Sequence, residues 1–266
     1  MKPLAQALRM EIKLGFVKMA RYPLQTLTSL LVLYVLFIGM FYGSRFLAGV
    51  GTVRSADLSR SATEAIAGYL LWFLSLFAID SMSQNIAEEA QTGTLEQLYL
   101  SRWDFSLVLF MRFVAAFLAS LAMLVPLLFL LVLSTGASVA LQLGKTLPVI
   151  ALTTIGLCGM GYMLGALTLI FKRIGNAMTL VQFVLLFLCL PPVEQLPGPL
   201  RYFALTLPLT QGIRLLRSIM LGPASRVRLS DVYFLVLTAL VYLVIGLLVF
   251  RWAQATARDR GLLGHY

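Results

Sequence analysis

Residues 232–250 read VYFLVLTALVYLVIGLLVF, a run of nineteen side chains without a charge. A helix that crosses the hydrocarbon core of a bilayer needs about 20 mainly apolar residues. The rest of the chain has a similar character, because 60% of its 266 residues are hydrophobic and only 12% are charged. Soluble domains carry about 25% charged residues. The sequence therefore predicts a polytopic integral membrane protein.

Five other runs are long enough and apolar enough to be spans. They are Tyr22–Ser44, Ala65–Ala87 with Asp80 inside it, Phe113–Gly144 with a start nearer Phe105, Thr146–Phe171 and Ile174–Val193. Together with Val232–Phe250 they predict an all-α fold of six transmembrane helices, with both termini on the same side of the membrane. No stretch between them has the composition of a soluble domain, so residues 1–266 are expected to form a single transmembrane domain.

The basic residues indicate the orientation of the chain. Of the 21 lysines and arginines, twelve fall on the side of the termini and nine on the opposite side. Since cytoplasmic flanks carry the excess of Lys and Arg, we expect a multi-pass protein of the inner (plasma) membrane with both termini in the cytoplasm. The net charge of +10 is typical of such flanks and of contact with anionic membrane lipid, and no nucleic acid is expected as a partner.

Residues 1–22 precede the first span and are basic. Leu4, Leu8, Ile12 and Phe16 repeat at a spacing of four residues, and the lysines and arginines lie mostly off that stripe. This pattern predicts an amphipathic helix that lies in the membrane interface. The alternative is a plain basic flank before a span.

Glycines inside the spans are spaced for close contact between helices. Gly39 and Gly43 form one G-x-x-x-G pattern, and Gly161 and Gly165 form another. Such patterns allow two helix backbones to approach each other. We therefore expect close helix packing at both pairs.

Residues 88–104, between the second and third spans, begin with EEAQTGTLEQLYLS. Gly93 can end a helix in the left-handed conformation, and Thr94 can cap a new helix, with Gln97 completing the capping box. Glu96 falls in the first turn, where a negative charge suits the helix dipole. The pattern predicts a helix end, a turn and a short helix at the cytoplasmic surface. The alternative is a capped connector without a further role.

The stretch EEAQTGTLEQLYLS resembles the signature loop of the type 2 ABC exporter permeases, which follows the second span and has the form E-x-x-x-G-T-L-E-x-L. The matching positions here are Glu89, Gly93, Thr94, Leu95, Glu96 and Leu98. Residues 207–222, LPLTQGIRLLRSIMLG, resemble the family segment N-P-L-T-x-x-x-E-A-L-R-x-x-x-L-G before the last span. The matching positions there are Pro208, Leu209, Thr210, Leu216, Arg217, Leu221 and Gly222. Leu207 and Arg214 replace the family's asparagine and acid, and Arg102 replaces a proline that follows the first motif.

This resemblance implies the permease subunit of an ATP-driven exporter. Two permease chains, identical or closely related, would associate, and two ABC ATPase subunits would bind beneath them. The segment 88–104 would be a coupling helix that docks in a groove of the ATPase, so that closure of the ATPases reorients the spans. The residues that the resemblance assigns to this coupling are Glu88, Glu89, Gly93, Thr94, Leu95, Glu96 and Leu98. The chain itself would be a transport subunit and not an enzyme, with ATP and Mg²⁺ bound by the partner and no cofactor of its own.

The residues also fit a chain without a catalytic, nucleotide or metal site. The letters GKT at 144–146 lack the upstream glycine of a phosphate-binding loop, and His265 is the only histidine, which argues against a His-based triad or metal cluster. An ion-coupled secondary transporter without an ATPase is the alternative, and it needs an ionisable residue near mid-membrane. Asp80 is the one candidate. Because it precedes Glu88 by about two turns, we expect it near the cytoplasmic edge, as a snorkelling or helix-capping acid.

The segment 194–228, before the last span, is expected on the outer side. Within it, Pro208–Leu221 predicts a helix about 21 Å long, which is too short to cross the membrane and is therefore re-entrant or interfacial. Its expected apolar face is Leu209, Ile213, Leu216 and Met220, and its expected polar face is Thr210, Arg214, Arg217 and Ser218. The hypothesis is that Arg214 and Arg217 border the outer exit and contact anionic or polar cargo. The alternative is that both snorkel to lipid phosphates.

Overall fold

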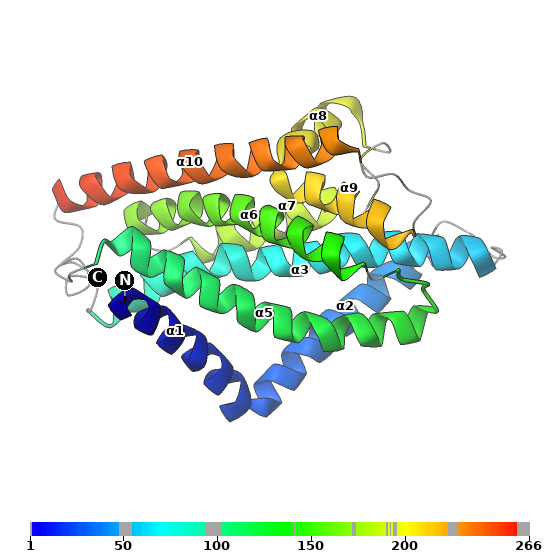
Figure 1. Cartoon of the computed structure of the whole chain (residues 1–266), viewed down its shortest axis with the longest axis horizontal. Helices are drawn as coiled ribbons and strands as arrows, with labels where there is room; N and C mark the ends of the chain where they lie inside the picture. The colour runs from blue at the N-terminus through cyan, green and yellow to red at the C-terminus, as the bar shows by residue number, and fades with distance from the viewer. Residues whose placement is uncertain are drawn as a thin grey trace.

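The protein is described here by a computed structural model that covers residues 2–47, 55–93, 103–140, 142–171, 174–189, 191, 193, 196–222 and 228–259. These residues fold into helices joined by turns and contain no strand, which confirms the all-α prediction (Figure 1). The helices are α1 (Lys2–Arg21), α2 (Pro23–Leu47), α3 (Ser55–Gln91), α5 (Phe105–Thr135), α6 (Leu143–Phe171), α7 (Gly175–Cys189), α8 (Gly198–Thr206), α9 (Pro208–Met220) and α10 (Leu229–Asp259).

Within the described residues, five helices are long and apolar enough to cross a membrane, which fits a multi-pass protein. They are Pro23–Gly43 in α2, Leu58–Gln91 in α3, and the whole of α5, α6 and α10. The predicted span Ile174–Val193 is instead the 15-residue helix α7, about 22 Å long. Its predicted end contained Pro191 and Pro192, which cannot continue a helix. The count of six spans is therefore not confirmed.

Two of the predicted spans have different bounds in the structure. α3 has 37 residues and extends past both ends of the predicted span Ala65–Ala87. α5 begins at Phe105, where the carboxylate of Asp104 accepts a hydrogen bond from the backbone N–H of Ser106. It ends at Thr135, because Gly136 adopts the left-handed conformation with φ 63°, so the predicted continuation toward residue 144 was wrong.

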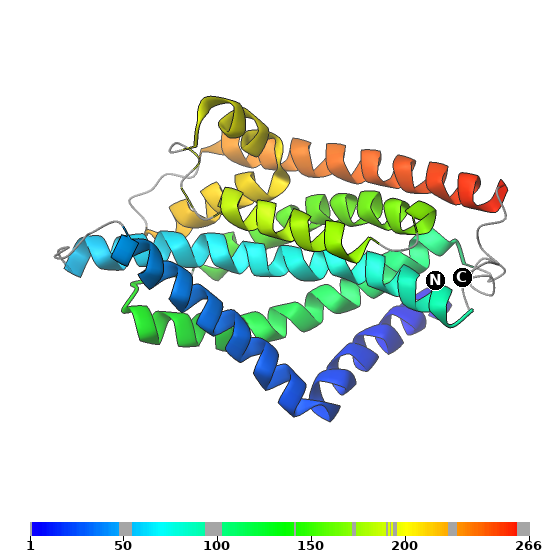
Figure 2. The same ribbon diagram turned by 180° about the vertical axis from the view of Figure 1, so that it is seen from behind.

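α3 is the central helix of the bundle. In its most apolar window 78% of the residues are buried, compared with 17% in α5 and in α10 and 11% in α2. It runs along the length of the molecule and packs against α5, α6, α7 and α9 (Figures 1 and 2). α3 also has the lowest hydropathy of the five helices and carries Asp80 within its span, which suits a helix surrounded by protein, whereas the one-sided burial of α2, α5 and α10 leaves their apolar outer faces exposed.

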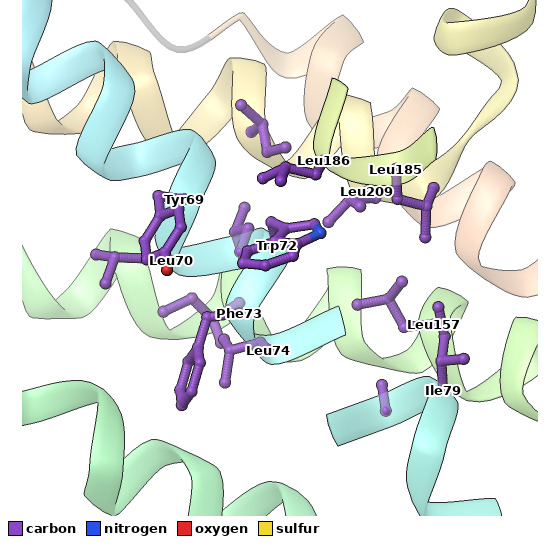
Figure 3. Close-up of a cluster of buried hydrophobic side chains, with 14 of the residues drawn as sticks. Tyr69, Leu70, Trp72, Phe73, Leu74, Ile79, Leu157, Leu185, Leu186 and Leu209 are labelled. Carbon is purple, nitrogen blue, oxygen red and sulfur yellow. The ribbon is translucent and has the colours of Figure 1, made fainter. Parts of the chain in front are cut away.

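Two aromatic side chains fix α3 to its neighbours through their polar atoms. Tyr69 and Trp72 are buried in a layer of leucines that includes Leu157 of α6 (Figure 3). The Tyr69 hydroxyl donates to the carbonyl of Leu33 in α2 at 2.7 Å, and Trp72 Nε1 donates to the carbonyl of Gln182 in α7 at 3.0 Å. Buried tyrosine and tryptophan need such partners, so these contacts determine how α2 and α7 lie on α3.

One of the two predicted glycine pairs provides close packing and the other does not. A Cβ added at Gly161 would lie 2.9 Å from a backbone oxygen of α3, and one at Gly246 of α10 would lie 2.2 Å from the carbonyl oxygen of Gly159 in α6. These helices therefore touch through their backbones, as small residues in spans allow. A Cβ at Gly39 or Gly43 would meet nothing within 4 Å, so the expectation for that pair was wrong for packing within one chain.

α1 and α2 meet at Tyr22 and diverge in a V beside the bundle (Figures 1 and 2). The predicted N-terminal helix is present, and it packs along α5, with Leu4, Leu8 and Ile12 half-buried. A Cβ at Gly15 would be 3.8 Å from a backbone oxygen of α5. α1 therefore lies on the bundle through Leu4, Leu8 and Ile12 of the predicted apolar stripe, whereas Phe16 is 43% exposed. The position of α1 in the membrane interface stays a prediction.

Candidate functional site

The end of α3 is where the acidic stretch begins. The helix ends at Gln91, and Gly93 adopts the left-handed conformation with φ 71°, as predicted. The backbone N–H of Thr92 donates to the carbonyl of Glu88 at 2.9 Å, which completes the last turn. Thr94, Leu95, Glu96 and Leu98 lie outside the described residues, so the capped helix that they predict stays a prediction.

Arg112 of α5 binds two carboxylates that are far apart in the sequence. Its Nη2 lies 2.7 Å from Oε1 of Glu89 in α3, and its Nε lies 3.6 Å from Oε1 of Glu11 in α1. Its Nη1 donates to Oδ1 of Asn85 at 3.5 Å. The three charged side chains are between 18% and 32% exposed. This group, named here the Arg112 clamp, ties α1, α3 and α5 together beside the acidic stretch.

Neighbouring Glu88 has a different environment from Glu89. Glu89 is half-buried in the Arg112 clamp, at a distance typical of a charge-assisted hydrogen bond. Glu88 is exposed, and no ion pair of the described residues includes it. The first of the two glutamates is thus presented to the surroundings, whereas the second anchors the end of α3.

A cavity of 720 Å³ lies next to the Arg112 clamp, between α1, α2, α3 and α5. Its lining consists of Glu11, Leu14, Gly15, Lys18, Thr28, Ser29, Val32, Leu33, Leu76, Phe77, Asp80, Ser81, Gln84, Asn85, Glu88, Arg112, Ala115 and Ala116. Asp80 faces it and accepts a hydrogen bond at 2.6 Å from Nε2 of Gln182 in α7. The helix continues for eleven residues after Asp80, so the interpretation of Asp80 as a helix-capping acid was wrong. It is a link between two helices on the wall of a cavity.

The comparison with known families agrees with this architecture. A family model described as "ABC-2 family transporter protein" matches residues 11–252. The chain belongs to the ABC-2 transporter family. The protein is therefore a multi-pass membrane permease of the ABC transporter class, and membership implies an ABC ATPase as its partner. A search of curated proteins finds no match.

The segment before the last span of this ABC-2 permease, predicted to lie on the outer side, differs from its prediction. α9 is buried on nearly all sides against α6, α3 and α10. Arg217 is 7% exposed; its Nε donates to the carbonyl of Glu64 at 3.0 Å, and its Nη1 donates to the carbonyl of Pro191 at 3.3 Å. Arg214 is exposed, and its Nη1 lies 3.4 Å from Oε1 of Gln211. The prediction of one polar face that presents both arginines was therefore wrong for Arg217, which is a tie inside the protein.

Arg112 is the candidate site residue that sequence reasoning missed. It had been counted only among the basic residues that favour a cytoplasmic flank. A signal was present, since a single arginine stands between the apolar stretches 105–111 and 113–135, and a charge in such a place needs a partner. Within the described segments, no group of three or more His, Cys, Asp or Glu side chains could hold a metal ion.

Proposed function

We propose that this permease forms the membrane part of an ATP-driven exporter. It would work as a pair of permease chains with two ATPase subunits beneath them, in the inner membrane with its termini in the cytoplasm. Substrate would leave the cytoplasm or the inner leaflet by alternating access. The family match over residues 11–252 carries this proposal, because an ABC permease takes its energy from a partner that binds ATP.

The proposed point of coupling is the stretch that starts at Glu88. Glu88 is exposed at the end of α3 and Gly93 turns the chain there, which supports docking by Glu88 and by the following residues, Thr94, Leu95, Glu96 and Leu98. Glu89 has a different part in this proposal, since Arg112 already binds it. Glu89 passes the movement of the stretch to α5 and α1.

α3 suits the transmission of such a movement. It is continuous over 37 residues, about 56 Å in length, and its far end lies against α9. A rigid, buried helix moves as a unit, because a close-packed core is not continuously deformable. A displacement at Glu88 would therefore reach the opposite end of the bundle.

The experiment is a substitution in the docking side of the stretch. Leu98→Asp places a charge on the apolar side that would enter the ATPase groove, while Gln142→Asp places the same charge in the turn before α6. We expect normal membrane insertion of both variants, loss of ATPase co-purification and of ATP-driven transport for Leu98→Asp, and wild-type behaviour for Gln142→Asp. Transport by Leu98→Asp at the wild-type rate would contradict the coupling assignment.

The alternative function is ion-coupled transport without an ATPase. Asp80, a carboxylate within the span Leu58–Gln91 that lines a cavity, is the observation in its favour. Proteoliposomes separate the two functions. The exporter needs the ATPase and ATP and transports without an ion gradient, whereas a secondary transporter moves substrate in response to the gradient alone.

A further inference from the structure

The cavity beside the Arg112 clamp concentrates negative charge in a protein that is basic overall. The net charge is +10 and the chain has only 11 acidic residues. Three of them, Glu11, Asp80 and Glu88, line the cavity. Arg112, one of its two lining bases, is already opposed by Glu11 and by the further carboxylate of Glu89. The cavity therefore has an excess of carboxylate that the Arg112 clamp does not neutralise.

Asp80 and Glu88 carry that excess. No ion pair among the described residues includes either of them, and the hydrogen bond from Gln182 to Asp80 brings no charge. Lys18 is the remaining base of the lining, and it is an exposed residue near the end of α1. A low-dielectric wall strengthens the field of such carboxylates. A cation is thus the ligand that the charges favour.

The lining also changes from apolar to polar along α3. Lining residues of this helix recur every three or four positions, which places them on one face. The face starts with Leu76 and Phe77, continues through Asp80 and Gln84, and ends at Glu88. α2 runs in the opposite direction along the molecule (Figure 1), and its polar lining residues Thr28 and Ser29 precede the apolar Val32 and Leu33. The two helices therefore change from apolar to polar in the same direction in space. A ligand with a charged head and an apolar body would fit this order in one orientation only.

The dimensions fit one such molecule. Sites for small ligands typically have volumes of about 300–1,000 Å³, and this cavity has 720 Å³. Its apolar wall is formed by Leu14, Val32, Leu33, Leu76 and Phe77. An aromatic ring such as that of Phe77 also attracts cations to its face.

We propose that this cavity binds an amphiphilic cation, a molecule with one positive centre and an apolar body. Its charge lies between Asp80 and Glu88, and its body lies against Leu76 and Phe77 of α3 and the facing side chains of α2. The molecule enters from the membrane, since the lining helices α2 and α3 are spans. The claim that this cation is transported as cargo rests on the proposed export function. The claim that it binds in the cavity does not.

The test compares two probes of nearly the same shape and opposite charge, tetraphenylphosphonium and tetraphenylborate. Equilibrium binding is measured on the full chain in phosphatidylcholine nanodiscs, with empty nanodiscs to subtract partition into lipid. We expect saturable binding of tetraphenylphosphonium at one site per chain and no saturable binding of tetraphenylborate.

Three variants locate the site. Asp80→Asn keeps an acceptor for Gln182, and Glu88→Gln removes the exposed charge; each is expected to weaken tetraphenylphosphonium binding roughly tenfold. Gln84→Lys removes no native charge and places a cation on the same wall, so it should abolish binding of the phosphonium. Glu64→Gln, at the opposite end of α3 and outside the lining, is the matched control and should bind as the wild type does.

Saturable binding of both probes, or phosphonium binding unchanged by all three cavity variants, would overturn the proposal. A cavity filled only by phospholipid would give the latter result. Since the assay contains no ATPase, its outcome is independent of the exporter proposal. Failure of ATP-driven transport with intact phosphonium binding would refute the proposed function alone, and the reverse result would refute this inference alone.

Discussion

The two ends of α3 are each attached by an arginine, but the attachments differ in kind. At the end near Glu64, Arg217 of α9 is buried, and it donates to the backbone carbonyls of Glu64 and Pro191. At the other end Arg112 is partly exposed, and it binds the side chains of Glu89 and Glu11. A bond from a buried guanidinium to a backbone carbonyl is fixed by the fold itself. A pair of partly exposed charges can separate and form again, because water can replace each partner.

This difference indicates that the two ends of α3 have different roles, one fixed and one able to change its contacts. The Arg217 attachment keeps α9 and Pro191 in place, whereas the Arg112 attachment lies beside the stretch where we propose that the ATPase docks. An element that must adopt two packed arrangements needs contacts that can change. The Arg112 clamp supplies them, and the Arg217 tie supplies the fixed reference.

The largest effect is expected from removing the Arg217 tie. Arg217→Ala removes two hydrogen bonds to backbone carbonyls and opens a gap in the core, at a cost of about 3 kcal/mol. The thermal unfolding temperature in nanodiscs should fall by several degrees. Arg217→Lys keeps the charge but cannot reproduce the planar guanidinium fork. Its unfolding temperature should therefore lie between those of the wild type and of Arg217→Ala. Wild-type stability of Arg217→Ala would show that the tie is dispensable.

Loss of the clamp should affect coupling more than stability. Arg112→Gln gives up two ion pairs that are partly exposed and together stabilise the fold by about 1 kcal/mol. We expect a folded protein that still binds its ATPase but transports more slowly for each ATP hydrolysed. The readout is the ratio of transport to hydrolysis in proteoliposomes. If that ratio is unchanged, Arg112 is a structural residue like Arg217.

The local pattern of the sequence predicted the parts of the fold that local chemistry determines. The apolar runs marked the long helices, and Gly93 marked the left-handed end of α3. Long-range contacts were missed, because Arg112 joins Glu11 and Glu89 across three helices and no spacing of three or four residues encodes that. Arg217 was placed on a polar face for a related reason. Helical periodicity shows which residues share a side of a helix. It does not show that Arg217 will be buried and will donate to the carbonyls of Glu64 and Pro191.

A smaller effect is expected at Arg214, which lies one turn before Arg217 but is exposed. Arg214→Gln should change the free energy of unfolding by less than about 0.5 kcal/mol. If Arg214 contacts anionic cargo at the outer exit, export falls while ATP hydrolysis is retained. Export that is unchanged for an anionic substrate would assign Arg214 to lipid phosphate instead. The comparison with Arg217→Ala separates a surface role from a structural one within the same helix.

The most direct test of the coupling account is a charge exchange in the Arg112 clamp. ATP-driven transport is measured for Arg112→Glu, for Glu89→Arg and for the double variant that carries both. All three are made in a Glu11→Gln background, so that a carboxylate at position 112 meets no second carboxylate from α1. Each single variant then places like charges together at the end of α3, whereas the double variant restores an opposite pair between α3 and α5. We predict that each single variant loses most of the transport per ATP hydrolysed and that the double variant recovers a large part of it. Single variants that transport normally, or a double variant no better than either, would contradict the claim that movement passes from the acidic stretch through Glu89 and Arg112.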